Sequence, residues 1–165
     1  ICRHPNIKDK TIFLNSMQKS KNFHDPFVQP PVTEEDFDKY LERYAADEHK
    51  SYLVLSETQG VQSLVGVINI NNIIRGCFLS GYLGYYATAE HAGSGKMSQG
   101  LQLVLNEAFN KLKLHRLEAN IQPDNYKSIN FVKRNGFTKE GFSPNYLKIN
   151  GKWCDHERWA IISEN

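Results

Sequence analysis

The chain has 165 residues, the length of one ordinary domain and too short for two, so we expect a single domain over residues 1–165. Apolar residues make up 40% of the chain and charged residues 23%, a balance that excludes collagen-like, low-complexity and disordered classes. Because 20 Lys and Arg stand against 18 Asp and Glu, the net charge of +2 indicates neither a nucleic acid nor a membrane surface as a partner.

Cysteine usage and apolar runs narrow the class further. The three cysteines, Cys2, Cys77 and Cys154, are odd in number and lack C-x-x-C spacing, so neither a disulfide framework nor a zinc site is predicted. No apolar run approaches the about 18 residues of a membrane span. The chain begins at Ile1, and no charged segment followed by an apolar one is recognisable. From these features we expect a cytoplasmic protein without a bound metal.

The first third of the chain predicts two helices joined by a proline-containing segment. Residues 9–20 place apolar side chains at helical spacing, whereas residues 22–32 contain three prolines and indicate an extended arm or loop. Thr33 can cap the second helix, and the acidic residues after it complement the positive helix end. The apolar face of this second helix comprises Phe37, Tyr40, Leu41 and Tyr44.

The middle of the chain predicts three strands and then a long helix. The strands cover residues 51–57, 63–71 and 78–87, and a turn at Gln59 and Gly60 joins the first two as a hairpin. Apolar side chains then recur every 3.6 residues between residues 97 and 112, which is the clearest helix pattern in the sequence.

The last third predicts a strand, a helix and a second hairpin. The strand covers residues 115–122, and the helix over residues 125–135 ends at Gly136, a residue suited to a left-handed helix cap. Strands over residues 137–147 and 153–162 flank an Asn-Gly turn. This order of elements predicts an α/β domain with a mixed, mostly antiparallel sheet of six to seven strands and helices on both faces.

A loop of small residues precedes the long helix and is the first candidate site. Free amides and the helix dipole at such a junction attract phosphate, and glycines let the backbone approach it closely. The Gly93-Ser94-Gly95-Lys96 segment superficially suggests a nucleotide P-loop. However, Glu90 stands where the first glycine should be, and Met97 stands where a magnesium-binding Ser or Thr is required. We therefore discount an NTPase and keep an anion site and an ordinary turn as alternatives.

Spaced motifs in the second half of the chain resemble the GNAT superfamily of acetyl-CoA dependent N-acetyltransferases, and within it the ribosomal-protein-alanine type. The motifs are Gly84-Tyr85, Gly93-x-Gly95-x-Met97, His115-Arg116-x-x-Ala119-Asn120, Asn125-x-x-Ser128, Gly136-Phe137-x-x-Glu140-Gly141 and Tyr146-Leu147-x-x-Asn150-Gly151-x-Trp153-x-Asp155-His156. The resemblance is nearly continuous from Gly84 to Ile162. It implies a GNAT fold, in which two neighbouring strands splay apart to form the acetyl-CoA cleft.

The resemblance also implies which residues bind acetyl-CoA. The pyrophosphate would rest on the amides of Ala92, Gly93, Ser94, Gly95, Lys96 and Met97. Backbone groups of Tyr86 and Ala87 would hold the pantetheine arm, and Asn120, Asn125 and Ser128 would line the far wall of the cleft. At the position of Glu90 the family favours Gln or Arg, so this carboxylate must point away from the pyrophosphate.

The reaction implied by the resemblance is direct attack of an uncharged amine on the thioester within a ternary complex. An α-amine, with a pKa near 7.7–8.0, needs less help to lose its proton than a lysine amine near 10.4. A strong base is therefore not essential for an α-amine. The resemblance to the ribosomal-protein-alanine type implies a protein N-terminal α-amine as the acceptor, and we expect a monomer or homodimer. The alternatives are a small-molecule amine acetyltransferase and a non-catalytic acyl-CoA binding or sensing domain.

The resemblance implies a candidate general acid and a group of substrate-side residues. Ser128 matches the position proposed to protonate the leaving thiolate in the ribosomal-protein type, whereas the Tyr that does so elsewhere in the superfamily is replaced by Val132. Residues expected on the substrate side are His24, Tyr82, Asn145 and Tyr146. Two of these, Tyr82 and Asn145, occupy positions that hold a carboxylate base in related enzymes. The base therefore stays open among Glu118, His91, His24, Asp155 and His156.

Overall fold

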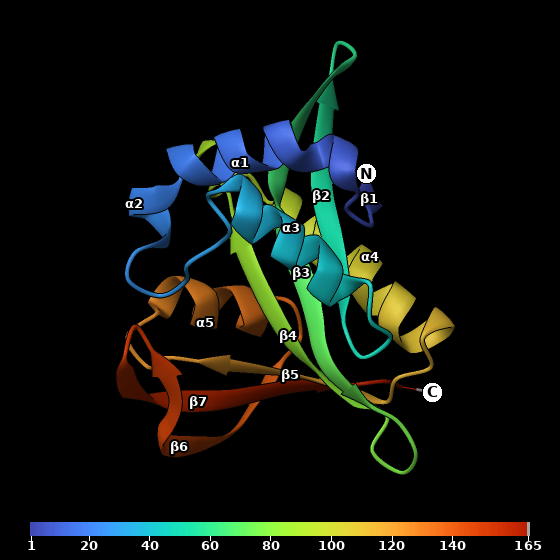
Figure 1. The fold of residues 1–165 in the computed structure, drawn as a ribbon. Helices are drawn as coiled ribbons and strands as arrows, with labels where there is room; N and C mark the ends of the chain where they lie inside the picture. Colours follow the sequence, from blue (N-terminus) through green and yellow to red (C-terminus); the bar gives the residue numbers. More distant parts are fainter. Residues whose placement is uncertain (165) are drawn as a thin grey trace.

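The computed structural model describes residues 1–164 and contains one seven-stranded sheet with helices on both faces (Figure 1). In chain order the elements are β1 (Cys2–Arg3), η1 (Ile7–Asp9), α1 (Lys10–Lys19), α2 (Lys21–His24), α3 (Glu34–Tyr44), β2 (Lys50–Thr58), β3 (Val61–Ile74), β4 (Ser80–Ala87), η2 (Ala89–His91), α4 (Lys96–Asn106), η3 (Glu107–Lys111), β5 (Arg116–Ile121), α5 (Tyr126–Arg134), β6 (Thr138–Ile149) and β7 (Lys152–Ile162). The predicted helices and strands are confirmed, with shifts of a few residues at their ends.

The strands lie in the order β1-β2-β3-β4-β5-β7-β6. All neighbours are antiparallel except β4 and β5, which are parallel. This confirms the mixed, mostly antiparallel sheet that the order of elements predicted. The single parallel pair places the chain segments after β4 and after β5 at the same end of the sheet.

The two faces of the sheet have separate hydrophobic cores. One core joins the sheet to α4 and α5 and includes Leu101, Leu117 and Val132. The other joins it to α1 and α3 and includes Phe13 and Phe37. Neighbouring tyrosines of β4 reach opposite cores, because side chains alternate along a strand: Tyr85 packs on the first core and Tyr86 belongs to the second.

The structure differs from the sequence prediction in three places. The long helix is α-helical only as far as Asn106 and continues as one π-helical segment, η3. The segment over residues 22–32, predicted as an extended arm or loop, is helical at its start, where α2 extends to His24. Phe78, predicted within a strand, is 62% exposed and precedes β4. A turn at Gly76 precedes it, and Leu79, with a positive φ of 44°, separates it from the strand.

Candidate active site

The parallel strands β4 and β5 separate after only three paired residues. Ser80, Gly81 and Tyr82 of β4 pair with residues 116–118 of β5, and the register ends there although both strands continue. Figure 1 shows the two ribbons diverging, with α5 beside the opening. Along this opening, strand edges that would normally hydrogen-bond to each other can bind a ligand instead.

Backbone register determines which groups of β4 face the opening. The Thr88 amide donates to the Val65 carbonyl of β3 (N···O 2.8 Å), and Tyr86 is paired with Val67. Because backbone groups of successive strand residues point to opposite edges, those of Tyr86 face β3. The backbone groups of Tyr85 and Ala87 therefore face the opening. Of the two residues that the resemblance named for the pantetheine arm, only Ala87 turns its peptide groups that way.

The small-residue loop provides an anion cradle at the start of α4. Gly95, in the left-handed conformation (φ 78°), is the N-cap of the helix, and Gly93 also has a positive φ of 74°. A Cβ at either glycine would meet no protein atom within 4 Å, so the space beside the backbone is open. The loop therefore fits a pyrophosphate, which needs close approach to main-chain amides.

Three of the six predicted cradle amides have no partner among the described residues, namely those of Gly93, Gly95 and Met97. The other three donate within the loop: Ala92 to the Ala89 carbonyl, Ser94 to the His91 carbonyl and Lys96 to the Ser94 hydroxyl. The Lys96 ammonium reaches the Ser56 hydroxyl (2.8 Å) and adds positive charge beside the loop. Glu90 lies exposed on η2.

Two asparagines predicted for the far wall have different surroundings. Asn125 caps α5, since its side-chain oxygen accepts a hydrogen bond from the Ser128 amide (3.3 Å). Asn120 lies in the part of β5 that no longer pairs with β4, and its buried Oδ1 has no hydrogen-bond partner among residues 1–164. An unpaired buried acceptor is costly, so Oδ1 is suited to receive a donor from a ligand.

Ser128 itself contacts β4. Its hydroxyl oxygen lies 2.5 Å from the hydroxyl oxygen of Tyr85, whose ring packs on Phe131 of α5 with ring centroids 4.9 Å apart. Burial raises the pKa of Tyr85, so its hydroxyl remains protonated at neutral pH. No local sequence pattern indicates this contact, because Tyr85 and Ser128 are 43 residues apart.

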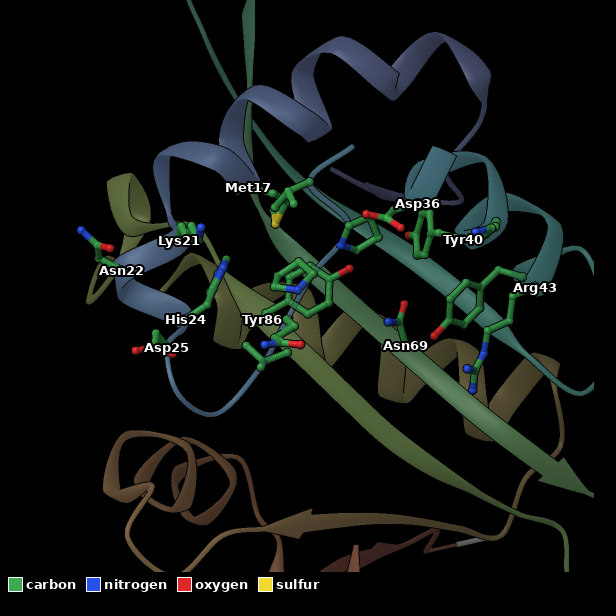
Figure 2. Close-up of a pocket in the computed structure, with 17 residues that line it drawn as sticks. Met17, Lys21, Asn22, His24, Asp25, Asp36, Tyr40, Arg43, Asn69 and Tyr86 are labelled. Atoms are coloured by element: carbon green, nitrogen blue, oxygen red, sulfur yellow. The ribbon is translucent and has the colours of Figure 1, made fainter. Parts of the chain in front are cut away.

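A cavity of about 860 Å³ lies on the opposite face of the sheet, beneath α1, α3 and the segment between α2 and α3. Figure 2 shows His24 and Tyr86 toward one end of this cavity and Arg43 at the other, with Asn69 between them. Of the four substrate-side residues that were predicted, only His24 lines the cavity.

Two hydrogen bonds fasten the cavity wall to the end of β4. His24 is 4% exposed, and its Nε2 donates to the Ala87 carbonyl (2.7 Å). The buried Ser20 hydroxyl accepts from the Ala89 amide (2.9 Å). Because Nε2 carries the hydrogen, Nδ1 of the neutral ring holds a lone pair, and this buried atom has no partner in the described part of the chain. Burial lowers the pKa of His24, which favours the neutral ring.

The other substrate-side residues do not line the cavity. Tyr82 lies near Tyr146 and Glu118, and burial together with the nearby Glu118 carboxylate raises the pKa of Tyr82. The Tyr146 ring meets the His156 ring edge to face, with centroids 6.1 Å apart. Asn145 is exposed at a left-handed position of β6, and its amide donates to Asp155.

The contacts of the five candidate bases distinguish one of them from the other four. Glu118 is paired with Arg116 (2.9 Å), His91 bonds Ser63, Asp155 accepts from the Asn145 amide, and His156 bonds the Cys154 carbonyl. His24 is the one of the five that lines the cavity, and it is also the one with a buried nitrogen that lacks a partner in the described chain. Across residues 1–164 there is no group of three or more His, Cys, Asp or Glu arranged to hold a metal.

A family model described as an acetyltransferase (GNAT) domain matches residues 1–138. The chain belongs to the GNAT acetyltransferase family. This confirms the resemblance seen in the spaced motifs, and it makes the chain an acyltransferase of the N-acetyltransferase class. The splayed sheet is the GNAT fold that the resemblance implied. Through residue 164, no helix is both long and apolar enough to cross a membrane.

Several relatives and solved structures are similar to the GNAT chain. The probable N-acetyltransferase YjcK of Bacillus subtilis is 36% identical over 76% of this chain and 68% of its own length. The ribosomal protein uS5-alanine N-acetyltransferase of Escherichia coli is 37% identical over 62% of this chain, a match that spans 53% of that enzyme. The crystal structure of ribosomal-protein-S5-alanine acetyltransferase from Vibrio fischeri superimposes with a TM-score of 0.86 at 25% identity, over 99% of this chain and 93% of that one.

The relatives do not share one acceptor. The spermidine N(1)-acetyltransferase of Vibrio cholerae is 25% identical over 91% of this chain and 86% of its own length. Membership of the family therefore leaves both protein amines and small amines open as acceptors.

Proposed function

We propose that this GNAT domain transfers the acetyl group of acetyl-CoA to the N-terminal α-amine of a protein. The observation that carries the proposal is the opening between β4 and β5. At its α4 end are the amides of Gly93, Gly95 and Met97, which have no partner among residues 1–164, and the His24 cavity lies on the other face of the sheet. A cofactor with a phosphate end and a reactive end would thus meet an acceptor that approaches from the opposite face.

In this proposal the chain's own groups position both substrates. The cradle amides hold the pyrophosphate, and the opened edge of β4 at Tyr85 and Ala87 holds the pantetheine arm. The same edge can offer an amide to the oxygen that becomes negative as the amine attacks. Ser128 supplies a hydrogen to the departing sulfur. Bound acetyl-CoA supplies the activated acetyl group.

The acceptor amine must be uncharged when it attacks. With a pKa near 7.7–8.0, about a tenth to a fifth of an α-amine is already neutral at pH 7. Nδ1 of His24 is the proton acceptor that the geometry supports best, since this ring lines the cavity and keeps an unshared lone pair. A weak base suffices, because the amine becomes much more acidic as its bond to the acetyl carbon forms.

The charges around the cavity favour a peptide over a polyamine. Asp25 and Asp36 are offset by Lys21, Lys39 and Arg43. A polyamine carries several positive charges and requires carboxylates along its length, which these counter-charges oppose. A peptide carries a single positive charge at its amino end and neutral amides behind it.

Thiol release from acetyl-CoA tests the proposal. Purified protein is given a short peptide with N-terminal Ala, the same peptide with a formyl-blocked amine, or spermidine, and mass spectrometry locates the acetyl group. We expect kcat/KM for the free peptide to exceed that for spermidine by at least about 10-fold, which corresponds to about 1.4 kcal/mol. Preference for spermidine would refute the choice of acceptor. Tight CoA binding without thiol release for any amine would favour the sensing domain instead.

A further inference from the structure

Tyr85 and Ser128 join the two elements that border the opening. Tyr85 follows the last β4 residues that pair with β5, whereas Ser128 lies in the first turn of α5. Their hydroxyl oxygens are 2.5 Å apart, and the Ser128 carbonyl is farther from the tyrosine hydroxyl, at 3.4 Å. The phenol is held by packing on Phe131, and the serine by the cap from Asn125. The hydroxyl pair is therefore fixed from both sides.

The pair has one hydrogen more than its mutual bond requires. Each hydroxyl contributes one hydrogen and can also accept, and a single hydrogen lies between the two oxygens. A phenol is a stronger donor than an aliphatic alcohol, with a reference pKa of about 10. Tyr85 donating to Ser128 Oγ is therefore the favoured arrangement. It leaves the serine hydrogen free to point elsewhere.

The chain lacks a phenol at the α5 position from which other superfamily members protonate the thiolate. Val132 stands there and is 0% exposed within the core. Tyr85 brings a phenol to the same helix from β4, and it reaches the serine that the family resemblance marks as the acid. The backbone of Tyr85 also faces the opening, so its side chain and its peptide border one site.

We propose that Tyr85 is a positioning residue that orients the Ser128 hydroxyl so that its hydrogen faces the departing sulfur. The inference rests on the proposed acetyl transfer. In the transfer step a bond forms between the amine nitrogen and the acetyl carbon, and the bond from that carbon to sulfur breaks. The sulfur takes the Ser128 hydrogen, Tyr85 keeps its own hydrogen and donates it to Ser128 Oγ as a hydrogen bond, and that oxygen regains one proton from solvent. The amine gives up its proton on the cavity side.

A double-mutant cycle with Tyr85→Phe, Ser128→Ala and both changes together tests the pair. Phenylalanine keeps the ring packing and removes only the hydroxyl. We expect Ser128→Ala to lower kcat by about 100-fold and Tyr85→Phe by about 10-fold, with KM for acetyl-CoA unchanged within about two-fold. The double variant should be no slower than Ser128→Ala, because the phenol acts only through the serine. Multiplied effects, or a Tyr85→Phe enzyme with normal kcat, would overturn the proposal.

A second measurement does not depend on transfer. The thiol of bound CoA is titrated by its ultraviolet absorbance, since a hydroxyl that faces the sulfur stabilises the thiolate. We expect the titration midpoint to rise by about 1 pH unit in Ser128→Ala and to rise in Tyr85→Phe as well. Tyr126→Phe is the matched control, because its hydroxyl is on the same helix but the residue is 70% exposed. Identical midpoints in the wild-type, Tyr85→Phe and Ser128→Ala proteins would refute the positioning role.

These outcomes are distinct from failure of the proposed function. If the wild-type protein binds CoA but acetylates neither peptide nor amine, the acetyl-transfer proposal fails, whereas the titration still reports whether Tyr85 orients a hydroxyl toward sulfur. If transfer proceeds and the titration and the cycle show no coupling, only the role of Tyr85 is lost.

Discussion

The cradle at the start of α4 yields a prediction in which charge alone is varied. Gly93 has φ 74°, and its amide has no partner within the described chain. We compare Gly93→Asp with Gly93→Asn, two side chains of nearly equal size. Asn and Asp tolerate the left-handed conformation better than other residues that have a Cβ. Both variants therefore carry the same backbone strain, and both project into the same open space.

The difference between the two variants follows from Coulomb's law. A carboxylate about 6 Å from one pyrophosphate charge is repelled by about 0.7 kcal/mol at a dielectric constant of 80 and by about 2.8 kcal/mol at 20. The dissociation constant for CoA should therefore be about 3-fold to about 100-fold higher for Gly93→Asp than for Gly93→Asn. Each variant should also be less stable than the wild type, because a side chain at this left-handed position strains the backbone by about 1 kcal/mol.

Calorimetric titration of CoA into each variant measures this ratio. The assay is run at about 0.05 M salt and again at about 1 M, where the screening length falls to about 3 Å. The ratio should shrink toward one at high salt, because the Asp side chain remains close to solvent. Equal dissociation constants for the two variants at low salt would show that no pyrophosphate charge lies near Gly93, and the cradle assignment would be abandoned.

Three further predictions concern stability. Gly66→Ala should lower the free energy of unfolding by about 2 kcal/mol more than Gly84→Ala in denaturant titrations. A Cβ at Gly66 would lie 2.6 Å from a β4 carbonyl oxygen, whereas a Cβ at Gly84 would lie 3.3 Å from a flexible side-chain amide. Equal losses for the two variants would contradict this prediction. The Arg3 guanidinium holds the pKa of Asp9 below its usual value, so stability is lost as the pH falls below about 3.8, and Arg3→Ala should reduce that acid-dependent loss. Burial lowers the pKa of His24, so the unfolded chain takes up its proton first. Wild-type stability should therefore fall from pH 7 to about pH 5 more than that of His24→Gln, and parallel profiles would exclude the effect.

Local patterns in the sequence were sufficient to predict the elements and the fold class. The apolar spacing of α3 and the Asn-Gly turn between β6 and β7 were recognisable without tertiary information. The π-helical segment η3 was not, because its apolar side chains continue the helical spacing of α4 and the pattern cannot show which carbonyl each amide bonds. Phe78 was assigned to a strand because aromatic residues favour strands, but the turn around Gly76 overrides that preference.

Part of the candidate site was recognisable from the sequence because it is formed by the backbone of a short segment. The glycine loop is such a case, since the residue types themselves define the left-handed positions of Gly93 and Gly95. The contacts of Tyr85 and His24 depend on partners 43 and 63 residues away, which no local pattern encodes. The register between β3 and β4 could not be predicted from the sequence either. This register decides whether Tyr85 or Tyr86 turns its peptide groups toward the opening.

Side chains alternate between the two faces of β4, so neighbouring residues of this strand face the donor side and the acceptor side of the proposed reaction. Tyr85 faces α5 and the hydroxyl of Ser128, while Tyr86 faces α1 and α3 and lines the acceptor cavity. The strand thus forms the boundary between donor and acceptor, and Ala87 at its end is bonded to His24 from the acceptor side. A change in the position of α2 would be transmitted through that bond to the Ala87 peptide, which borders the thioester in the proposed complex.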